Sequence, residues 1–141
     1  MDNKIYYKKG YKYQLSKPYK SVVPIRPDER ITTRFIELIP DYSPNGILCI
    51  SVGYAWDGPS GLTIDTKNFM RGPLEHDAFY QLMRLGYLPQ SARELADQRL
   101  HDVCRADGMS RLRAWYVLRA VRKFAGFAAD PKNAKKEYVA P

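Results

Sequence analysis

The chain has few cysteines, no long hydrophobic run and no recognisable signal peptide. Two cysteines among 141 residues, Cys49 and Cys104, do not form the disulfide framework of a small secreted domain. No apolar run approaches the roughly 18 to 20 residues that a membrane-spanning helix needs, and the start Met-Asp-Asn-Lys has no apolar core for secretion. These absences exclude a disulfide-stapled scaffold and a helical membrane protein, and we expect a reduced, intracellular setting.

An excess of positive charge is the clearest feature of the composition. The chain has 23 Lys and Arg against 15 Asp and Glu, a formal charge of +8, and its 45% of hydrophobic residues can form one modest core. The charge favours anionic surroundings such as nucleic acid, a lipid surface or an acidic partner. No recognised nucleic-acid-reading motif accompanies it, so composition does not choose among these partners.

The first part of the chain has the composition of strands and turns. Residues 31–39 are rich in β-branched and aromatic side chains, residues 43–46 (Ser-Pro-Asn-Gly) are a turn signal, and residues 47–52 are again apolar. This pattern predicts two strands joined as a hairpin. Residues 11–13 (Tyr-Lys-Tyr) alternate in polarity and predict a half-buried edge strand. We expect a small antiparallel sheet.

Three helices are predicted after a glycine-rich loop. Residues 56–72 include the run Gly-Pro-Ser-Gly, which breaks regular structure. Such a loop can turn its carbonyls or amides toward an ion, or can be a plain tight turn. Apolar residues at helical spacing then predict helices over residues 73–85, from about 91 to 107, and from 110 to about 125.

Local signals mark the helix starts. Pro73 suits the first position of the first helix, Ser91 with Glu94 forms a capping box for the second, and Ser110 caps the third. The apolar spacing also assigns each helix a buried face. These faces are Leu74, Ala78, Leu82 and Leu85 in the first helix, Ala92, Leu95, Ala96, Leu100, Val103 and Cys104 in the second, and Leu112, Trp115, Tyr116, Ala120, Val121 and Phe124 in the third.

His76 and Asp97 are the residues that carry candidate chemistry. The first two helices are joined by a short connection, so they should be antiparallel neighbours, and both residues lie away from the shared turn, where they can face each other. The carboxylate would then fix the imidazole tautomer and leave the outer ring nitrogen to take a proton from water. The alternative stays open, because a histidine bonded to an aspartate often serves packing alone.

The residues around this pair resemble phospholipases A2, particularly the small prokaryotic and parvoviral capsid types. The run Glu-His-Asp-Ala-Phe-Tyr at residues 75–80, followed by Asp97, is similar to the His-Asp-x-x-Tyr helix and partner aspartate of those enzymes. The resemblance implies that His76 is the general base, that Asp97 orients it, and that Tyr80 positions Asp97. The paired cysteines of most secreted phospholipases are missing, and the β-rich first half is foreign to that class.

The same resemblance implies a calcium site. The turn that contains Gly58, Ser60 and Gly61 stands upstream of the helix, where those enzymes carry a glycine-rich calcium loop. Asp77, a hard oxygen ligand on a different side of the helix from His76, would complete the site with carbonyls from this loop. The Ca²⁺ would polarise the carbonyl or phosphoryl group under attack.

A longer stretch, residues 53–126, resembles a phage- and prophage-encoded domain family of unknown function. The family pattern is an Asp-Gly-Ala-Ser-like loop, a His-Asp-x-x-Tyr helix, an Ala-Asp helix and a third helix that ends in glycine. Here these correspond to residues 57–60, with proline in place of the usual alanine, and to residues 76–80, 96–97 and 116–126. This resemblance implies a viral gene product, located in the host cytoplasm or the virion, and implies no reaction.

We therefore expect one α+β domain, with a β-rich part (residues 1–55), a glycine-rich loop (56–72), three helices (73–126) and a polar tail (127–141). Two functions stay open. One is a calcium-dependent, phospholipase-A2-like hydrolase of lipid or a related ester, acting at an anionic lipid surface. The other is a non-enzymatic phage tail or virion assembly protein that binds other phage proteins and keeps the His/Asp pair as a structural clasp.

Overall fold

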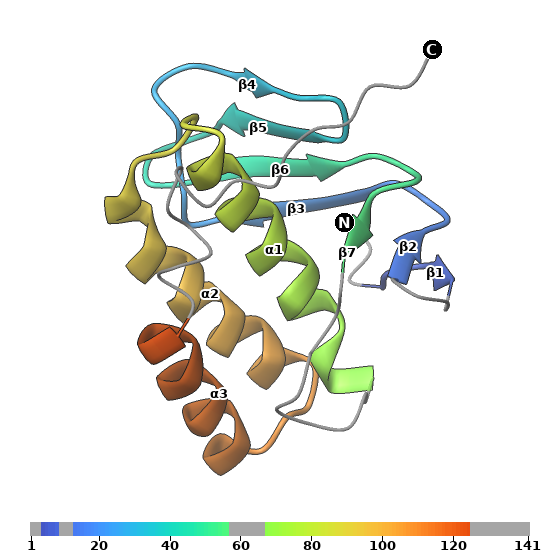
Figure 1. Ribbon diagram of the computed structural model, residues 1–141, viewed down its shortest axis with the longest axis vertical. Helices are drawn as coiled ribbons and strands as arrows, with labels where there is room; N and C mark the ends of the chain where they lie inside the picture. The colour runs from blue at the N-terminus through green and yellow to red at the C-terminus, as the bar shows by residue number, and fades with distance from the viewer. Residues whose placement is uncertain (1–3, 9–12, 57–66, 125–141) are drawn as a thin grey trace.

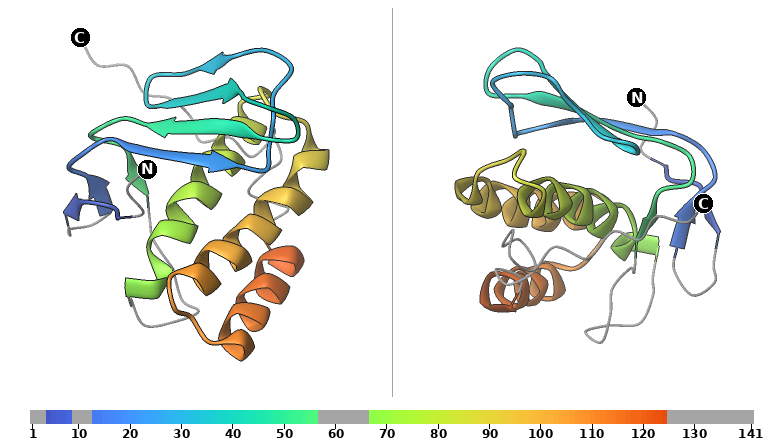
Figure 2. Two further views of the ribbon diagram at one scale, coloured as in Figure 1. Left: turned by 180° about the vertical axis from the view of Figure 1, so that it is seen from behind. Right: turned by 45° about the horizontal axis from the view of Figure 1, so that its top comes forward.

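The computed structural model of the protein describes residues 4–8, 13–56 and 67–124. Antiparallel strands occupy the first half and three α-helices the second, so the predicted α+β class is confirmed (Figure 1). Seen from the side, the larger sheet is one layer and α1 (Arg71–Arg84) with α2 (Arg93–Ala106) is a second layer beneath it (Figure 2). The third helix, α3 (Arg111–Phe124), lies on the far side of that helical layer.

The larger sheet has four strands, in the order β3 (Tyr19–Val23), β6 (Gly46–Ile50), β5 (Ile36–Pro40) and β4 (Ile31–Thr32). Every neighbouring pair is antiparallel. Alternate residues of β3 and β6 are buried, as expected for a sheet with one face on the core. The hairpin of β5 and β6 was predicted from the sequence, whereas β3 was not.

Residues 31–39 are not one strand, as the sequence predicted, but two strands that fold back on each other. The Thr33 hydroxyl accepts a hydrogen bond from the Ile36 amide at 3.0 Å, and the Thr33 amide donates to the Ile36 carbonyl at 2.8 Å. This local turn competes with a continuous strand. It lets β4 pair with β5, with Ile31 opposite Leu38.

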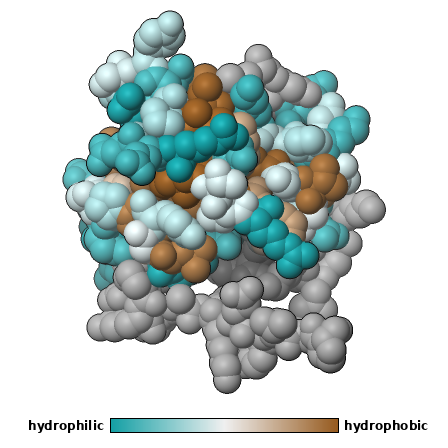
Figure 3. All heavy atoms as spheres, turned by 90° about the horizontal axis from the view of Figure 1, so that it is seen from above, coloured by the Kyte–Doolittle hydropathy of each residue, from teal (hydrophilic) through white to brown (hydrophobic). Residues whose placement is uncertain are grey.

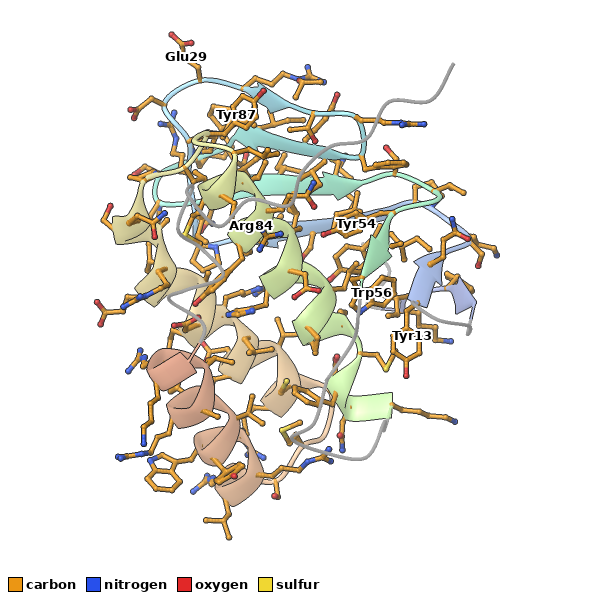
Figure 4. The ribbon with its side chains drawn as sticks, viewed as in Figure 1. Tyr13, Glu29, Tyr54, Trp56, Arg84 and Tyr87 are labelled. Carbon is orange, nitrogen blue, oxygen red and sulfur yellow. The ribbon has the colours of Figure 1, made fainter. Side chains whose placement is uncertain are left out.

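A smaller sheet, in the order β1 (Tyr7–Lys8), β2 (Tyr13–Leu15) and β7 (Ala55–Trp56), connects the N-terminal segment to the chain that leads into the helices. The rings of Tyr13 and Trp56 lie 5.6 Å apart between centroids, and Figure 4 shows Trp56 and Tyr54 beside α1 (Figure 4). The Tyr54 hydroxyl donates to Oε1 of Gln81 on α1 at 3.2 Å. The small sheet is thereby fastened to the helical layer.

The helix boundaries correct two sequence predictions. Helix α1 begins at Arg71, two residues before Pro73. Helix α2 has no side-chain cap, because a short 3-10 helix at Gln90–Ala92, closed by the Ala92 amide bonded to the Pro89 carbonyl, occupies the place of the predicted capping box. The predicted cap of α3 is present, since Ser110 Oγ accepts from the Arg113 amide at 3.3 Å.

Two hydrophobic clusters hold the layers together. One joins the larger sheet to α1 and α2, and the other lies between α2 and α3. Leu85 and Leu95, which were predicted to be buried, are about half exposed. Viewed from the end that carries β4 and the α1–α2 turn, hydrophobic residues form patches separated by hydrophilic ones (Figure 3).

The buried face of α3 differs from the predicted one. Ala114 and Val117 are fully buried against α2, while Leu112, Trp115 and Tyr116 are 76%, 51% and 54% exposed. Both sets of positions have helical spacing, so periodicity did not choose between them. Phe69 and Met109 belong to the α2–α3 cluster with Ala114 and Val117. The small residues at the contact bring α3 close to this cluster, and the large aromatic residues are left outside.

Candidate active site between α1 and α2

Close packing of the two antiparallel helices creates the candidate site. A Cβ atom at Gly72 on α1 would lie 2.9 Å from Cys104 Sγ and 2.9 Å from Leu100 Cδ1 on α2. Glycine at this position therefore lets the helices approach more closely than a larger residue would allow. The short separation brings polar side chains of α1 within hydrogen-bond reach of α2.

His76 and Asp97 meet across this contact, as their spacing predicted. His76 Nε2 lies 2.7 Å from Asp97 Oδ1, and the residues are 7% and 1% exposed. Tyr80, one turn after His76, donates its hydroxyl to the same Asp97 oxygen at 2.6 Å. The rings of His76 and Tyr80 lie 4.1 Å apart between centroids. The three side chains form one buried cluster, which we call the His76 cluster.

The hydrogen bonds assign a role to each member of the His76 cluster. A carboxylate only accepts, so His76 Nε2 carries the proton and Nδ1 is the basic nitrogen. Within the part of the chain that is described, Nδ1 makes no hydrogen bond. Burial, and then the hydrogen bond to Asp97, raise the pKa of Tyr80 far above its usual value. Tyr80 therefore stays protonated and acts as a donor to Asp97.

The second Asp97 oxygen, Oδ2, is buried and has no hydrogen-bond partner among the described residues. An unsatisfied buried acceptor costs about 1 to 3 kcal/mol. Such atoms are rare in native structures, and a bound water, an ion or a chemical role can each account for one. The hydrogen-bonding capacity of the His76 cluster is thus not fully used by the described residues, whereas a purely structural contact favours full use.

A second buried carboxylate, Glu75, lies next to His76 in the sequence and was not predicted to matter. Glu75 is 1% exposed, accepts from the Tyr19 hydroxyl at 2.5 Å, and is paired with Arg99 Nε at 2.9 Å. Arg99 Nη2 also donates to Ser21 Oγ at 2.9 Å. This Glu75 cluster ties β3 to both helices. Its sequence signal is weak, because only the position of Glu75 beside the apolar stripe of α1 marks it as buried.

A third polar contact joins the same two helices. Arg71 at the start of α1 forms a two-pronged pair with Asp107 at the end of α2, with N to O distances of 2.9 to 3.2 Å. Its side chain is 8% exposed. Within the described residues, the His76 cluster, the Glu75 cluster and this pair hold the two helices together in addition to their hydrophobic packing.

The predicted calcium site is described only in part. Asp77 lies on α1 and is half-buried, whereas Gly58, Ser60 and Gly61 lie outside the described residues. The described ranges contain no group of three or more His, Cys, Asp or Glu side chains arranged to hold a metal ion. One carboxylate with loop carbonyls is chemically suitable for Ca²⁺. Because the loop lies outside the described residues, the calcium site stays a prediction.

Neither cysteine is suited to be a nucleophile. Burial raises the pKa of Cys104 to about 12 and also raises the pKa of Cys49. A thiol acts as a nucleophile through its thiolate form, and both shifts disfavour that form. Covalent catalysis by cysteine is therefore not what these residues support.

Comparisons of the chain with models of protein families, with curated proteins and with solved structures found no match.

Proposed function

We propose that the His76 cluster activates water for the hydrolysis of an ester bond in a lipid or a related substrate. The geometry of His76 with Asp97 supports this proposal. With Nε2 committed to the carboxylate 2.7 Å away, Nδ1 is the group that takes the proton from an attacking water. Asp97 fixes the tautomer and stabilises the imidazolium that forms.

Tyr80 has a positioning role in this proposal. Its hydroxyl holds Asp97 Oδ1 from the side of α1, at 2.6 Å, and its raised pKa keeps it a donor throughout the neutral range. Because His76 and Tyr80 lie on the same rigid helix, the distance and orientation between the proposed base and Tyr80 stay constant. The proposed reaction needs no protein nucleophile, consistent with the raised pKa values of both cysteines.

In this proposal, calcium would be held by Asp77 with carbonyls of Gly58, Ser60 and Gly61. The bound ion would polarise the ester carbonyl under attack. Asp77 follows His76 directly on α1, and its carboxylate is the hard oxygen ligand that this proposal assigns to the ion.

The exposed face of α3 supports an anionic lipid surface as the partner. It carries Leu112, Trp115 and Tyr116, and the Arg119 guanidinium lies 5.2 Å from the Trp115 ring centroid. The helix contains five basic residues and no acidic one over Arg111–Phe124. Aromatic rings with neighbouring cations suit the boundary between headgroups and acyl chains. In the described part of the chain, no helix has both the length and the apolar character to cross a bilayer.

A second candidate is a phage tail or virion assembly protein in which the His76 cluster is a clasp. The observation that favours it is the low exposure of the cluster, with His76 at 7% and Tyr80 at 2%. The Glu75 cluster beside it fastens the same helices without suggesting any chemistry. In this reading the aromatic and basic face of α3 binds another phage protein.

One experiment separates the two candidates. The full chain is incubated with phosphatidylglycerol vesicles, with calcium or with a chelator, and fatty-acid release is measured beside His76→Gln. His101→Gln is the matched control, because His101 is the other histidine of the chain and contacts Asp102 on the surface of α2. The hydrolase proposal expects release by the native chain and by His101→Gln, and a loss of at least about 100-fold in His76→Gln.

The opposite result favours the clasp. If the native chain releases no fatty acid and His76→Gln melts at a lower temperature than His101→Gln, the pair has only a structural role. Release that is unaffected by the chelator would keep the base and remove the calcium.

A further inference from the structure

A cavity with two arginines in its wall lies between β3 and the helical layer. Its volume is about 460 Å³. Strand β3 contributes Ser21 and Val22, α1 contributes Arg71, and α2 contributes Arg99 with three further residues. His76 is not among its lining residues, so this Arg71–Arg99 cavity is distinct from the proposed hydrolytic site.

The two guanidinium groups are held in place before any ligand arrives. Arg71, with a side chain 8% exposed, is fixed by Asp107. Arg99, with a side chain 20% exposed, is fixed by Glu75 and by Ser21 Oγ at 2.9 Å. Fixed side chains lose little conformational entropy when they bind a ligand, which favours affinity.

In each of the two ion pairs, the arginine lines the cavity and the carboxylate does not. Arg71 and Arg99 line it, whereas Asp107 and Glu75 do not. The acidic residue in the wall is Asp102, whose side chain is 58% exposed. Solvent and salt screen an exposed charge far more than a buried one. The wall therefore presents guanidinium N–H groups to the cavity, while the carboxylates that balance Arg71 and Arg99 lie outside its lining.

Hydrogen-bond donors remain available in the wall. A guanidinium has five N–H donors. Arg99 uses Nε and Nη2 for Glu75 and Ser21, and its Nη1 donates to no residue in the described ranges. A guanidinium edge pairs best with the oxygens of a phosphate or carboxylate. The oxygens of a phosphate can accept from more than one donor, and Arg71 and Ser21 line the same cavity as Arg99.

We propose that the Arg71–Arg99 cavity binds a phosphate group, either as free phosphate or in a lipid headgroup. The site does not depend on hydrolysis at His76, and the overall charge of +8 would draw such an anion toward the chain. The two arginines held by ion pairs, the donor left on Arg99 and the cavity that both arginines line together carry the proposal.

The test measures binding of inorganic phosphate to the full chain by calorimetry, at ionic strength matched with chloride. Arg99→Lys keeps the charge and removes the planar fork, and we expect the dissociation constant to rise about tenfold or more. Arg105→Lys is the matched control, since Arg105 lies on the same helix and bonds to the Met109 carbonyl. Ser21→Ala, which keeps both ion pairs, should weaken binding less.

A second arm uses phosphatidylcholine vesicles with and without phosphatidic acid. Binding of inorganic phosphate that depends on Arg99 supports a site for free phosphate. Binding only to the phosphatidic acid vesicles, with the same dependence on Arg99, supports a headgroup site. If neither probe binds, or if Arg99→Lys and Arg105→Lys behave alike, the proposal is overturned. Should Arg99→Lys fail to fold, Ser21→Ala and the guanidinium resonances of the native chain under phosphate titration decide the question.

Discussion

Each of the first two helices carries one buried carboxylate that is bonded to a side chain of the other helix, and the two carboxylates have similar sets of partners. Glu75 on α1 and Asp97 on α2 are each 1% exposed, and each accepts a hydrogen bond from a tyrosine hydroxyl. The second partner of each is a basic side chain, Arg99 for Glu75 and His76 for Asp97. The two clusters differ in what that basic side chain can do.

Arg99 is charged at every accessible pH, so the Glu75 cluster is a fixed ion pair. Both Glu75 oxygens have partners, and the contact joins β3 to the helices. A histidine, unlike an arginine, can serve as a general base, and Asp97 Oδ2 has no partner in the described ranges. Under the proposed hydrolysis, Glu75 would serve the fold and Asp97 would serve the chemistry.

The largest expected effect is on activity. Asp97→Asn should lower the hydrolytic rate by about 10³- to 10⁴-fold, because the amide no longer holds the reactive tautomer of His76. Glu75→Gln, at the matched position of the other cluster, should leave most of the rate intact. Fatty-acid release under identical conditions checks this. Equal losses in the two variants would mean that both carboxylates act only through stability.

The next effect is on stability and should be found at the Glu75 cluster instead of the His76 cluster. Arg99→Met leaves Glu75 buried without its counter-ion and should lower the free energy of unfolding by about 3 to 5 kcal/mol. The double variant Arg99→Met with Glu75→Gln should recover much of this loss, because no unpaired charge remains. Urea unfolding at neutral pH provides the measurement. A loss in the double variant as large as in the single one would contradict a buried-charge cost.

A change at the helix contact should disturb both clusters together. Gly72→Val places methyl groups where Cys104 and Leu100 already lie 2.9 Å from a single Cβ, so α2 must move away. We expect the free energy of unfolding to fall by about 1 to 3 kcal/mol and the hydrolytic rate to fall with it. Thermal unfolding and the fatty-acid assay check both parts. Unchanged activity would show that His76 and Asp97 tolerate a wider separation.

The smallest effect should appear in the two tyrosines. Tyr19→Phe and Tyr80→Phe each remove one hydrogen bond to a carboxylate and should cost about 1 kcal/mol or somewhat more at pH 7. The two losses should be similar, because the bonds to the carboxylates are of similar length, 2.5 and 2.6 Å, and the further bond that Tyr19 accepts from Arg71 Nη1 is long, at 3.4 Å. Urea unfolding midpoints of the two variants give the comparison. A much larger loss for either variant would show that its cluster depends on the hydroxyl beyond a single bond.

These tyrosines also predict the behaviour at high pH. Burial, followed by the neighbouring carboxylate, raises the pKa of both phenols in the folded chain above the value of about 10 in the unfolded chain. The folded state then holds protons that the unfolded state releases. Stability from this source is complete below about pH 10 and is lost as the pH rises further. Each Phe variant should therefore lose less unfolding free energy than the native chain as the pH rises from about 10 to about 11.

Long-range contacts mark the limit of what could be predicted. The meeting of His76 with Asp97 was predictable, because a short connection between two helices restricts their register. The Glu75 cluster was not, since it needs Tyr19 of an unpredicted strand to lie above α1. Residues 31–39 have the composition of one strand, and the turn at Thr33 depends on local hydrogen bonds with Ile36 that composition does not reveal.

The sequence by itself determined the α+β order, the hairpin of β5 and β6 and the three helices, because these follow from local periodicity and short connections. It allowed the contact between His76 and Asp97 without requiring it. Only the tertiary structure decided which side of α3 is buried and where two arginines line a cavity. It also decided that one buried carboxylate pairs with an arginine and the other with a histidine. Burial depends on which surfaces fit together in space. The apolar spacing of α3 was compatible with two faces, and packing against α2 selected Ala114 and Val117 over Trp115 and Tyr116.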